Sequence, residues 1–454
     1  MAVFADKCPD IKFTVVDTNI SRIDAWNYKD LECLPIFEPG LSSLIERTRG
    51  KNLFFSHEIN KNIKEADMVF ISVNTPTKKT GLGAGLASDL KWVEICARQI
   101  SEVAVGHTIV IEKSTLPVRT AKVIKDILTS KSKNYENNSK TFSILSNPEF
   151  LSEGTAIEDL ILPDRVLIGG EDQKAINYLK RIYENWVPSE KIITTNLWSS
   201  ELSKLVANAF LAQRISSINS ISALCEVTGA NISEVSNAVG LDSRIGSKFL
   251  SPGPGFGGSC FKKDILNLVY LCEYFGLKEV SDFWSQVVYI NSWQQERICK
   301  VIVDKLFRNL SGKVLTILGF AFKANTNDTR ESPAIEIAKF LLIEGAIINI
   351  HDPQVSEKKI NEEIINSLQK SNENVEKYKS KWVFKKNIFD AVQNSDAIII
   401  TTGWDLYKKL DWENIAEKMR HPAWVFDTRN VVDLEKIISV GLHYWGVGKG
   451  FEET

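Results

Sequence analysis

Short apolar runs recur along residues 1–150, and polar residues follow each of them. Residues 11–17 alternate between apolar and polar side chains and end at Asp17. The runs at 66–73, 108–112 and 142–145 are more uniformly apolar, which predicts buried strands. Because stretches with helical spacing separate these runs, the pattern favours a parallel, doubly wound sheet.

Polar triplets follow three of these predicted strands, namely Asn74-Thr75-Pro76, Lys113-Ser114-Thr115 and Asn147-Pro148-Glu149. In an open parallel sheet, ligands bind at the carboxyl ends of the strands. The sequence therefore predicts a ligand site along this edge of the sheet.

The middle of the chain is predicted to be helical. Residues 198–227 contain neither Pro nor Gly and carry apolar residues at helical spacing, which predicts one long amphipathic helix that stops near Gly229. Lys204 and Asn208 are four residues apart on its other face. A lone lysine on a polar helix face is usually solvated, so this spacing alone does not define a site.

A second α/β unit is predicted from residue 313 onwards. Apolar runs at 313–320, 347–350, 397–402 and 424–427 predict strands, and the second run leads to Asp352. The Lys-, Glu- and Asn-rich residues 355–381 are predicted to form an exposed insertion, and residues 131–140 a surface loop.

Cys260 stands out because of its surroundings. It follows the loop Pro252-Gly253-Pro254-Gly255-Phe256-Gly257-Gly258, whose glycines allow a ligand to approach the backbone. Helical spacing begins just after it and continues as far as Gly276, so the thiol lies where a helix dipole favours the thiolate. Asp264 is one turn further on. We interpret Cys260 as a nucleophile beside a carboxylate, and a buried structural cysteine is the alternative.

The bulk composition narrows the class of protein. The chain has 454 residues, of which 44% are hydrophobic and 25% charged, as in a soluble globular protein of two or three domains. A net charge of −2 gives no general affinity for nucleic acid. The 7 cysteines show no metal-binding spacing and fit a reducing compartment, and neither a signal peptide nor a membrane-spanning run is predicted.

Spaced motifs over nearly the whole chain resemble those of the UDP-glucose 6-dehydrogenases, a family of nucleotide-sugar 6-dehydrogenases. In chain order, the matching segments are 14–17, 73–77, 112–115, 146–151, 201–208, the Cys260 loop, 319–323, 328–332 and 426–429. Several motifs in a fixed order are more specific than any one of them.

The resemblance implies an α/β fold in which two Rossmann-like, doubly wound parallel-sheet domains are joined by a central helical domain with one long helix. The expected domains are an NAD-binding domain at 1–195, a helical dimerisation domain at 196–310 and a UDP-sugar-binding domain at 311–454. It also implies NAD as cofactor, UDP-glucose as substrate, a cytoplasmic location, and a homodimer or homohexamer without nucleic-acid or membrane partners.

The reaction that the resemblance implies is the four-electron oxidation of UDP-glucose to UDP-glucuronate. Cys260 would capture the intermediate aldehyde as a thiohemiacetal, which is oxidised to a thioester and hydrolysed. Lys204 and Asn208 would stabilise oxyanions at C6. Asp264 would exchange protons through a water, Glu149 would serve the hydrolytic step, and Thr115 would order water.

The binding residues are likewise carried over from the family. The implied cofactor contacts are Asp17, Arg22, Val73, Asn74, Thr75, Ser114, Thr115, Glu153, Lys263 and Arg330. The implied substrate contacts are Glu149, Phe150, Leu151, Lys204, Asn208, Phe249, Phe256, Gly257, Phe261, Phe322, Lys323 and Arg429, together with Arg244 donated by a neighbouring subunit.

The sequence departs from the family at its start. Family members have a strand and a Gly-x-Gly-x-x-Gly turn before the segment that corresponds to residues 1–4, and neither occurs in this sequence. Neither 81–85 nor the turn at 319–323 replaces that dinucleotide-binding turn. Since the missing strand is central in the usual strand order, we expect an incomplete N-terminal sheet with a gap inside it.

Three functions remain open at this point. The first is an active enzyme whose sequence lacks its true start. The second is a chain that binds UDP-sugar but holds NAD poorly, acting as a subunit partner or an inert product. The third is a 6-dehydrogenase for a different nucleotide sugar. The 200–205 segment resembles animal members and favours UDP-glucose, and the presence of the catalytic residues favours the enzyme.

Overall fold

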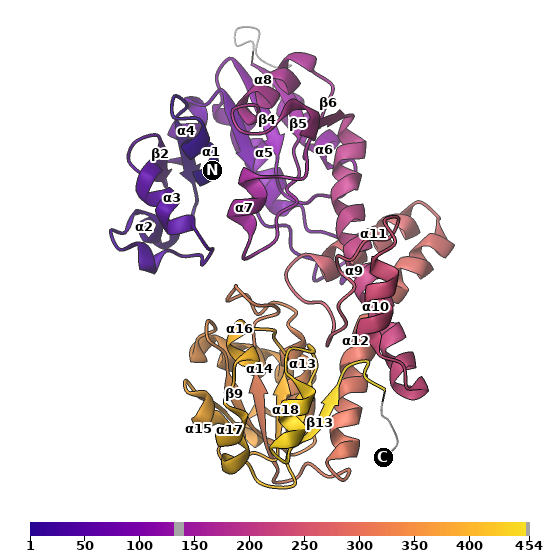
Figure 1. Cartoon of the computed structure of the whole chain (residues 1–454). Coiled ribbons are helices and arrows are strands. Elements are labelled where there is room, and N and C mark those ends of the chain that lie inside the picture. Colours follow the sequence, from indigo (N-terminus) through magenta and orange to yellow (C-terminus); the bar gives the residue numbers. More distant parts are fainter. Residues whose placement is uncertain (131–139, 451–454) are drawn as a thin grey trace. The chain divides into compact units, whose positions relative to one another are not determined.

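A computed structural model of the chain describes residues 1–130 and 140–450, so most of the loop predicted at 131–140 lies outside the described residues (Figure 1). Contacts divide the chain into two compact units. The first comprises Met1–Ala207 with Leu266–Lys278, and the second comprises Asn208–Ile265 with Glu279–Thr454.

The main sheet of the first unit has the strand order β3-β4-β5-β6-β7. Its strands are β3 (Met68–Ile71), β4 (His107–Glu112), β5 (Thr141–Ser146), β6 (Val166–Gly170) and β7 (Ile192–Thr195). All neighbours are parallel except β5 and β6, which pair antiparallel through Leu145–Gly170 and Ser146–Gly169. The strands predicted at 66–73, 108–112 and 142–145 are parallel to one another as expected, and β6, which the sequence did not predict, is antiparallel to β5. The segment between the two strands carries only the short helix α7 (Ala156–Ile161), and β6 returns alongside β5 without a long crossover helix.

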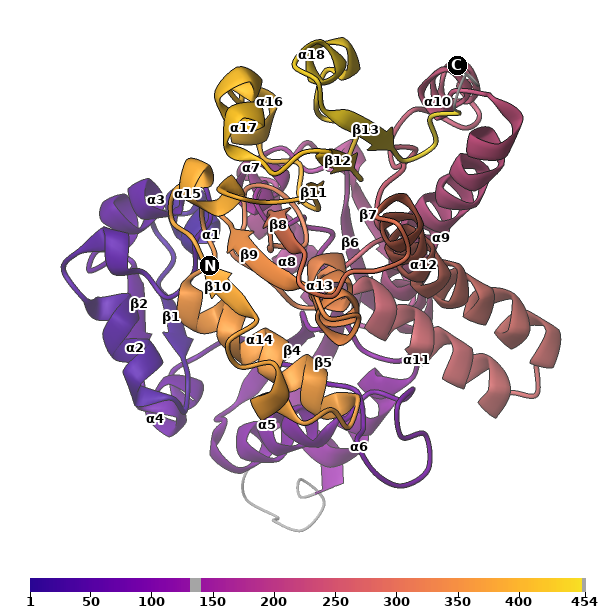
Figure 2. The same ribbon diagram turned by 90° about the horizontal axis from the view of Figure 1, so that it is seen from below.

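Strands β1 (Phe13–Val16) and β2 (Leu53–Ser56) form a separate parallel sheet, seen in indigo in Figure 2. Within residues 1–130 and 140–450, no strand pairs β1 with β3, so the predicted gap is present. Helix α1 (Ala2–Lys7) packs at this break, because the ring of Phe4 lies 6.1 Å from that of Phe13 in β1 and 5.9 Å from that of Phe70 in β3.

Helices cover both faces of the main sheet. Ile109 and Ile111 of β4 belong to one hydrophobic cluster, while Val110 between them belongs to another. Successive side chains of a strand point to opposite faces, and in a doubly wound sheet both faces are covered by helices, so an apolar strand is buried on both sides. The other helices of the unit are α2 (Ile20–Asn27), η1 (Leu31–Cys33), α3 (Leu41–Thr48), α4 (Ile59–Lys64), α5 (Lys91–Val103), α6 (Thr120–Ser130), α8 (Gln173–Tyr183) and η3 (Ser189–Lys191).

The predicted long helix is confirmed as α9 (Leu197–Thr228), which begins in the first unit and ends in the second. Three further helices follow, namely α10 (Ile232–Gly240), α11 (Phe261–Tyr274) and α12 (Lys278–Lys305). Among the described residues, none of the helices combines the length and the apolar character that a membrane crossing requires.

The second unit contains a parallel sheet with the order β10-β9-β8-β11-β12-β13. Its strands are β8 (Val314–Leu318), β9 (Ile347–His351), β10 (Trp382–Phe384), β11 (Ala397–Ile400), β12 (Trp424–Asp427) and β13 (His443–Gly446). The accompanying helices are α13 (Pro333–Ile343), α14 (Glu357–Lys370), η4 (Val375–Lys377), α15 (Ile388–Val392), α16 (Asp405–Lys408), α17 (Trp412–Lys418) and α18 (Leu434–Ser439). Figure 2 shows α13 and α14 on one side of the strands and α16, α17 and α18 on the other.

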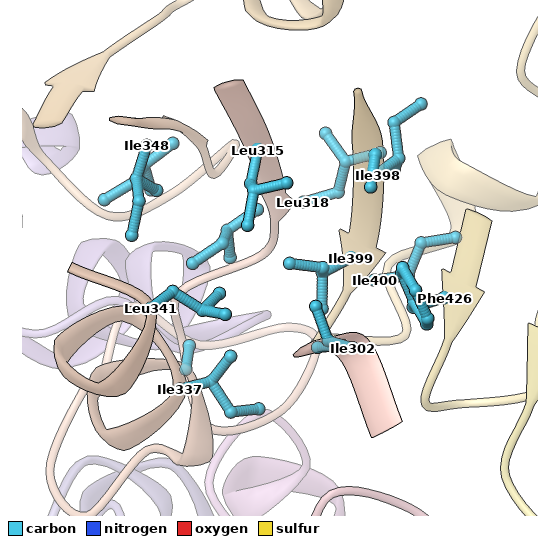
Figure 3. Close-up of a cluster of buried hydrophobic side chains, with 14 of the residues drawn as sticks. Ile302, Leu315, Leu318, Ile337, Leu341, Ile348, Ile398, Ile399, Ile400 and Phe426 are labelled. Carbon is cyan, nitrogen blue, oxygen red and sulfur yellow. The ribbon is translucent and has the colours of Figure 1, made fainter. Parts of the chain in front are cut away.

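The core of this sheet is built by alternating strand residues. In Figure 3, Ile399 of β11 lies near Ile302 of α12, and both are fully buried. The prediction of an exposed insertion at 355–381 is wrong. Its first part is α14, which buries Ile360, Ile364 and Leu368 at a spacing of four residues. The Lys-, Glu- and Asn-rich composition belongs to the outer face of an amphipathic helix.

Candidate active site

The loops that follow β3 and β4 are tied to each other. The Ser114 hydroxyl donates to the carbonyl of Val73 at 2.6 Å, and the Thr75 hydroxyl donates to the carbonyl of Thr115 at 3.0 Å. The amide N–H of Asn147, after β5, donates to the carbonyl of Glu112 at 2.9 Å. The predicted polar triplets are thus brought together at the carboxyl ends of neighbouring strands.

Lys204 is buried, although it lies on the face of α9 that its sequence pattern marks as polar. Its exposed fraction is 4%, and its Nζ lies 3.1 Å from Oε1 of Glu149. The other oxygen of Glu149 accepts from the amide of Leu151 at 2.7 Å. The ring of Phe150 lies 5.5 Å from Lys204 Nζ and 3.9 Å from the guanidinium of Arg165. A buried ammonium beside a carboxylate can stabilise developing negative charge.

Two further carboxyl groups of the first unit are buried. Glu112 ends β4, and Glu201 precedes Lys204 by three residues on α9. Glu201 accepts from the amides of Arg119 at 2.7 Å and Ala121 at 2.8 Å, at the start of α6. Burial raises the pKa of Glu201 to about 7. Burial, and then the charge of Glu201, raises the pKa of Glu112 well above its usual value. This acid pair comes from the strand that leads to Thr115 and from the helix that carries Lys204.

Lys113 belongs to the polar triplet that follows β4, and the sequence predicts no role for it. Its Nζ donates to Oδ1 of Asn147 at 2.9 Å and to the hydroxyl of Tyr183 at 3.3 Å. The pKa of Lys113 is lowered to about 8, mainly because burial desolvates the ammonium; the charge of Glu149 opposes this shift and that of Lys204 adds to it. The ammonium holds together the loops that follow β4 and β5.

In the second unit, Cys260 directly precedes the first residue of α11, as predicted. The amide of Asp264 donates to the carbonyl of Cys260 at 2.9 Å, so Cys260 caps the helix. Its thiol is half-buried and lies 3.4 Å from the hydroxyl of Ser259. A helix N-terminus favours the thiolate, which is the form of cysteine that attacks carbonyl carbon.

Asp264 is 1% exposed and is held from two sides. Nδ2 of Asn208, itself buried on α9, donates to its Oδ2 at 2.6 Å. Nζ of Lys263 lies 3.8 Å from its Oδ1. The structure therefore brings together Asn208, Asp264 and the helix that begins after Cys260.

The glycines of the Cys260 loop have close neighbours within the chain. A Cβ on Gly257 would lie 2.4 Å from the carbonyl oxygen of Glu331 and 2.9 Å from Cβ of Phe322. A Cβ on Gly258 would lie 3.1 Å from the ring of Phe322, and its amide donates to the carbonyl of Arg330 at 2.8 Å. The sequence argument assigned these glycines to the approach of a ligand. At Gly257 and Gly258 the packing of the loop on the 322–331 segment is a further reason for glycine, and the approach of a ligand there stays a prediction.

Several predicted sugar contacts gather around this loop. The ring of Phe261 lies 5.8 Å from that of Phe256 and 6.4 Å from that of Phe249. Arg429 donates to the carbonyl of Phe322 at 3.1 Å, and burial lowers its pKa to about 10. Nζ of Lys323 lies 5.7 Å from the ring of Phe322. Aromatic rings and an arginine in one place suit a nucleotide diphosphate.

The remaining predicted contacts have neighbours of their own. Arg244 is exposed beside Asp242, and Arg330 forms an ion pair with Asp328 at 2.6 Å. Asp17 follows β1 and accepts from the amide of Asn19 at 2.9 Å, and Arg22 lies in the exposed first turns of α2. Asn74 lies in the loop after β3, and Glu153 in the loop after β5.

Backbone amides of the turn after β8 are already hydrogen-bonded within the chain. Oδ2 of Asp352 accepts from the amides of Phe320 at 2.6 Å and Ala321 at 3.0 Å. A dinucleotide pyrophosphate needs such amides free to donate. The geometry agrees with the expectation that residues 319–323 are not a dinucleotide-binding turn.

Sequence reasoning missed three buried amide side chains that bind the backbone of the glycine loop, namely Asn219, Asn291 and Gln294. The available signal was the presence of uncharged polar residues on the otherwise apolar faces of α9 and α12. That signal indicates a buried polar contact but does not identify the partner.

Sequence profiles of the UDP-glucose/GDP-mannose dehydrogenase family match most of the chain. The NAD-binding domain matches residues 1–187, the central domain residues 198–293, and the UDP-binding domain residues 316–434. The chain is 52% identical to UDP-glucose 6-dehydrogenase 3 of Arabidopsis thaliana over 467 residues, which cover 100% of this chain and 95% of that protein. It is also 52% identical to UDP-glucose 6-dehydrogenase of Mus musculus, over 99% of this chain and 90% of the mouse protein.

A solved structure has the same fold. A UDP-glucose dehydrogenase from the archaeon Pyrobaculum islandicum matches with a TM-score of 0.83 and 28% identity, over 98% of this chain and 94% of the archaeal one. The chain belongs to the UDP-glucose/GDP-mannose dehydrogenase family.

Proposed function

We propose that this protein is an NAD-dependent oxidoreductase that converts UDP-glucose to UDP-glucuronate. The observation that carries the proposal is 52% identity, over the whole chain, to proteins named UDP-glucose 6-dehydrogenase. The Cys260, Asp264 and Asn208 group and the Lys204–Glu149 pair supply the chemistry that this reaction needs.

The residues at the strand ends of the first unit fit NAD. Asp17 presents a carboxylate after β1, which suits ribose hydroxyl groups. The loops 73–75 and 113–115 lie at the carboxyl ends of β3 and β4, where such sheets bind nucleotides. Arg22, Glu153, Lys263 and Arg330 are the further contacts that we propose. NAD supplies the hydride acceptor for each of the two oxidation steps when it is bound.

Cys260 is the proposed nucleophile. Its thiolate adds to the C6 aldehyde to form a thiohemiacetal, and loss of a hydride from C6 leaves a thioester. Water then cleaves the C–S bond, which gives the carboxylate and returns the thiol. The half-buried position of Cys260 before α11 supports this role, because the helix dipole favours the thiolate. The covalent bond keeps the aldehyde from escaping between the two oxidations.

The remaining catalytic roles follow from charge and protonation. The ammonium of Lys204 and the amide of Asn208 stabilise the oxyanion at C6. Asp264 exchanges protons through a water, for which its fixed position beside Asn208 is suited. Glu149 acts in the hydrolysis, and Thr115 orders the water. Each role can be tested by substituting the single side chain that carries it.

The sugar nucleotide is proposed to bind through the aromatic and cationic residues of the second unit. These are Phe249, Phe256, Gly257, Phe261, Phe322, Lys323 and Arg429, with Phe150 and Leu151 from the first unit and Arg244 from a neighbouring subunit. A panel of UDP-glucose, UDP-N-acetylglucosamine and GDP-mannose tests the choice of sugar. UDP-glucuronate identified by mass spectrometry, with no oxidation of the other two, is the expected result. Oxidation of another sugar in preference would overturn this choice.

We further propose a cytoplasmic homodimer or homohexamer. Large apolar side chains are exposed on the part of α9 within the second unit, including Phe210 at 56%, Leu224 at 55% and Val227 at 81%. Such side chains on one long helix favour self-association. Light scattering after gel filtration should give twice or six times the chain mass, and a monomer at micromolar concentration would overturn the proposal.

A second function is favoured by one observation, namely the separation of the β1–β2 sheet from β3. Among the described residues, strands β1 and β3 each have an unpaired edge at this break, which would weaken the support of the NAD site. The chain would then bind UDP-glucose and hold NAD poorly. Calorimetric titration of each ligand against the 454-residue chain separates the two functions.

A further inference from the structure

The backbone of the glycine loop before Cys260 is held by a buried amide. Asn291 of α12 is 6% exposed, and its side chain makes both possible hydrogen bonds with Phe256. The amide of Phe256 donates to Oδ1 at 2.7 Å, and Nδ2 donates to the carbonyl of Phe256 at 3.1 Å. The Asn291 side chain thus makes the two hydrogen bonds that a neighbouring β-strand would make with Phe256.

Two further amides hold the start of the same loop. The amide of Gly253 donates to Oδ1 of Asn219 on α9 at 2.8 Å, and Nε2 of Gln294 on α12 donates to the carbonyl of Gly253 at 2.9 Å. Both side chains are fully buried. We call Asn219, Asn291 and Gln294 the amide clamp. It pairs both backbone groups of Gly253 and both of Phe256.

Gly255 lies between the two clamped residues and is fitted to the clamp. Its φ is +112°, which side chains rarely adopt, and a Cβ there would lie 2.7 Å from Oδ1 of Asn291. The glycine at this position is therefore required by the clamp itself. Any side chain at 255 displaces the Asn291 amide.

The clamp is anchored beyond the loop. Oε1 of Gln294 accepts from Nε of Arg297 at 3.1 Å, which fixes the orientation of the Gln294 amide. Arg297 in turn forms an ion pair with Glu226 of α9 at 2.7 Å, and Oε1 of Glu226 accepts from the amide of Gly448 at 2.7 Å. One continuous set of polar contacts thus joins two long helices and the 447–450 segment to the loop.

On the far side of the clamp, the chain is fixed up to the nucleophile. The amide of Gly258 donates to the carbonyl of Arg330, and the carbonyl of Cys260 accepts from the amide of Asp264. The backbone from Gly253 to Asp264 is therefore held at successive points. Phe256 is one of these points, and it lies four residues before Cys260.

Resting on the proposed function, we infer that Asn291 is a positioning residue for the Cys260 nucleophile, acting through the backbone of Phe256 with Gln294 and Asn219 as its supports. Buried amides also pair loop backbones for stability alone. The two roles differ in what they predict, because a positioning residue changes the reaction of Cys260 more than it changes the folding of the chain.

The test compares Asn291→Ala with a matched control, Asn349→Ala, which removes another buried amide in the same unit. Asn349 lies in β9 and donates to the carbonyl of Ala391 at 2.7 Å, away from the glycine loop. Three measurements are made on each full-length variant, namely steady-state kinetics with UDP-glucose and NAD, which give kcat and the KM for NAD, hydrogen exchange of residues 253–260, and the rate of Cys260 alkylation by iodoacetamide.

For Asn291→Ala we expect kcat to fall roughly 10²-fold, as a misplacement of about 1 Å can produce, while KM for NAD changes less than about twofold. Exchange at 253–260 should accelerate, and alkylation of Cys260 should rise several-fold because the half-buried thiol gains access. Asn349→Ala should leave all three unchanged even if it lowers Tm.

A second variant removes the ambiguity of a new cavity. Gly255→Ala keeps the Asn291 side chain but pushes its amide away, so it should reproduce the loss of kcat. Combined with Asn291→Ala, it should cost less than the product of the two single effects, because both act on one contact.

Normal kcat in Asn291→Ala, or an equal loss in Asn349→Ala, overturns the inference. If the wild-type chain does not oxidise UDP-glucose, the proposed function fails, and alkylation still decides the positioning role. An unchanged alkylation rate in Asn291→Ala would then overturn it, and a several-fold rise would support it.

Discussion

The buried pair Glu112 and Glu201 predicts an unusual dependence of stability on pH. Burial raises the pKa of Glu201 from its usual 4.5 to about 7 in the folded chain. Between these values, the folded chain keeps a proton that the unfolded chain has lost. Stability is therefore fully present below pH 4.5 and falls as the pH rises towards 7.

The size of this effect follows from the shift. At about 1.4 kcal/mol for each pKa unit, a rise from 4.5 to about 7 corresponds to a loss of about 3 kcal/mol across that window. Burial, and then the charge of Glu201, also raises the pKa of Glu112, so this group changes stability in the same direction.

The substitution Glu201→Gln removes the titration of Glu201 and preserves its size. It retains one acceptor for the amides of Arg119 and Ala121 and loses the other, which costs about 1.5–3 kcal/mol at every pH. It also removes the charge that raises the pKa of Glu112. The slope of stability against pH is therefore the informative quantity.

The assay is urea unfolding, followed by tryptophan fluorescence, at intervals from pH 5 to pH 8.5. Wild type should lose about 2 kcal/mol of unfolding free energy between pH 5 and pH 7.5 through Glu201, and Glu201→Gln should give a flatter profile. The exposed Glu190→Gln, also in the first unit, should follow wild type. Parallel profiles for wild type and Glu201→Gln would refute the reasoning.

Substitutions at three further residues test the site and its loop. Cys260→Ala should abolish uronate formation and Cys260→Ser should block completion of the four-electron oxidation, so near-normal turnover by the alanine variant would exclude the covalent mechanism. Lys204→Ala should lower kcat roughly 10²–10³-fold, and a change in KM alone would make Lys204 a binding residue. Gly257→Ala should lower the free energy of unfolding by about 1–3 kcal/mol, because its Cβ would lie 2.4 Å from the carbonyl oxygen of Glu331. The control Gly403→Ala, whose Cβ would have its nearest neighbour at 3.5 Å, should leave stability unchanged. Equal Tm values for the two variants would contradict the packing argument.

Much of the fold could be predicted where the pattern is local. Helix α9 was predictable because residues 198–227 lack any residue that breaks a helix, and β4 and β11 because their apolar runs are short and bounded by polar residues. The start of α11 after Cys260 was likewise predictable from the glycines before it.

What could not be predicted depends on partners distant in sequence. The pattern of α9 marks Lys204 as polar but does not show that Glu149 and Phe150 cover it. Composition alone did not reveal that α14 buries three apolar residues. Glycine spacing does not distinguish approach by a ligand from the packing of Phe322 on Gly257 and Gly258.

The central claim is that one active chain carries UDP-glucose through two oxidations. The most direct test is the yield of NADH from limiting UDP-glucose, with the purified 454-residue chain and excess NAD. The account predicts two NADH for each UDP-glucose consumed, with UDP-glucuronate as the product. Binding of UDP-glucose without formation of NADH, or one NADH with release of a free aldehyde, would contradict it.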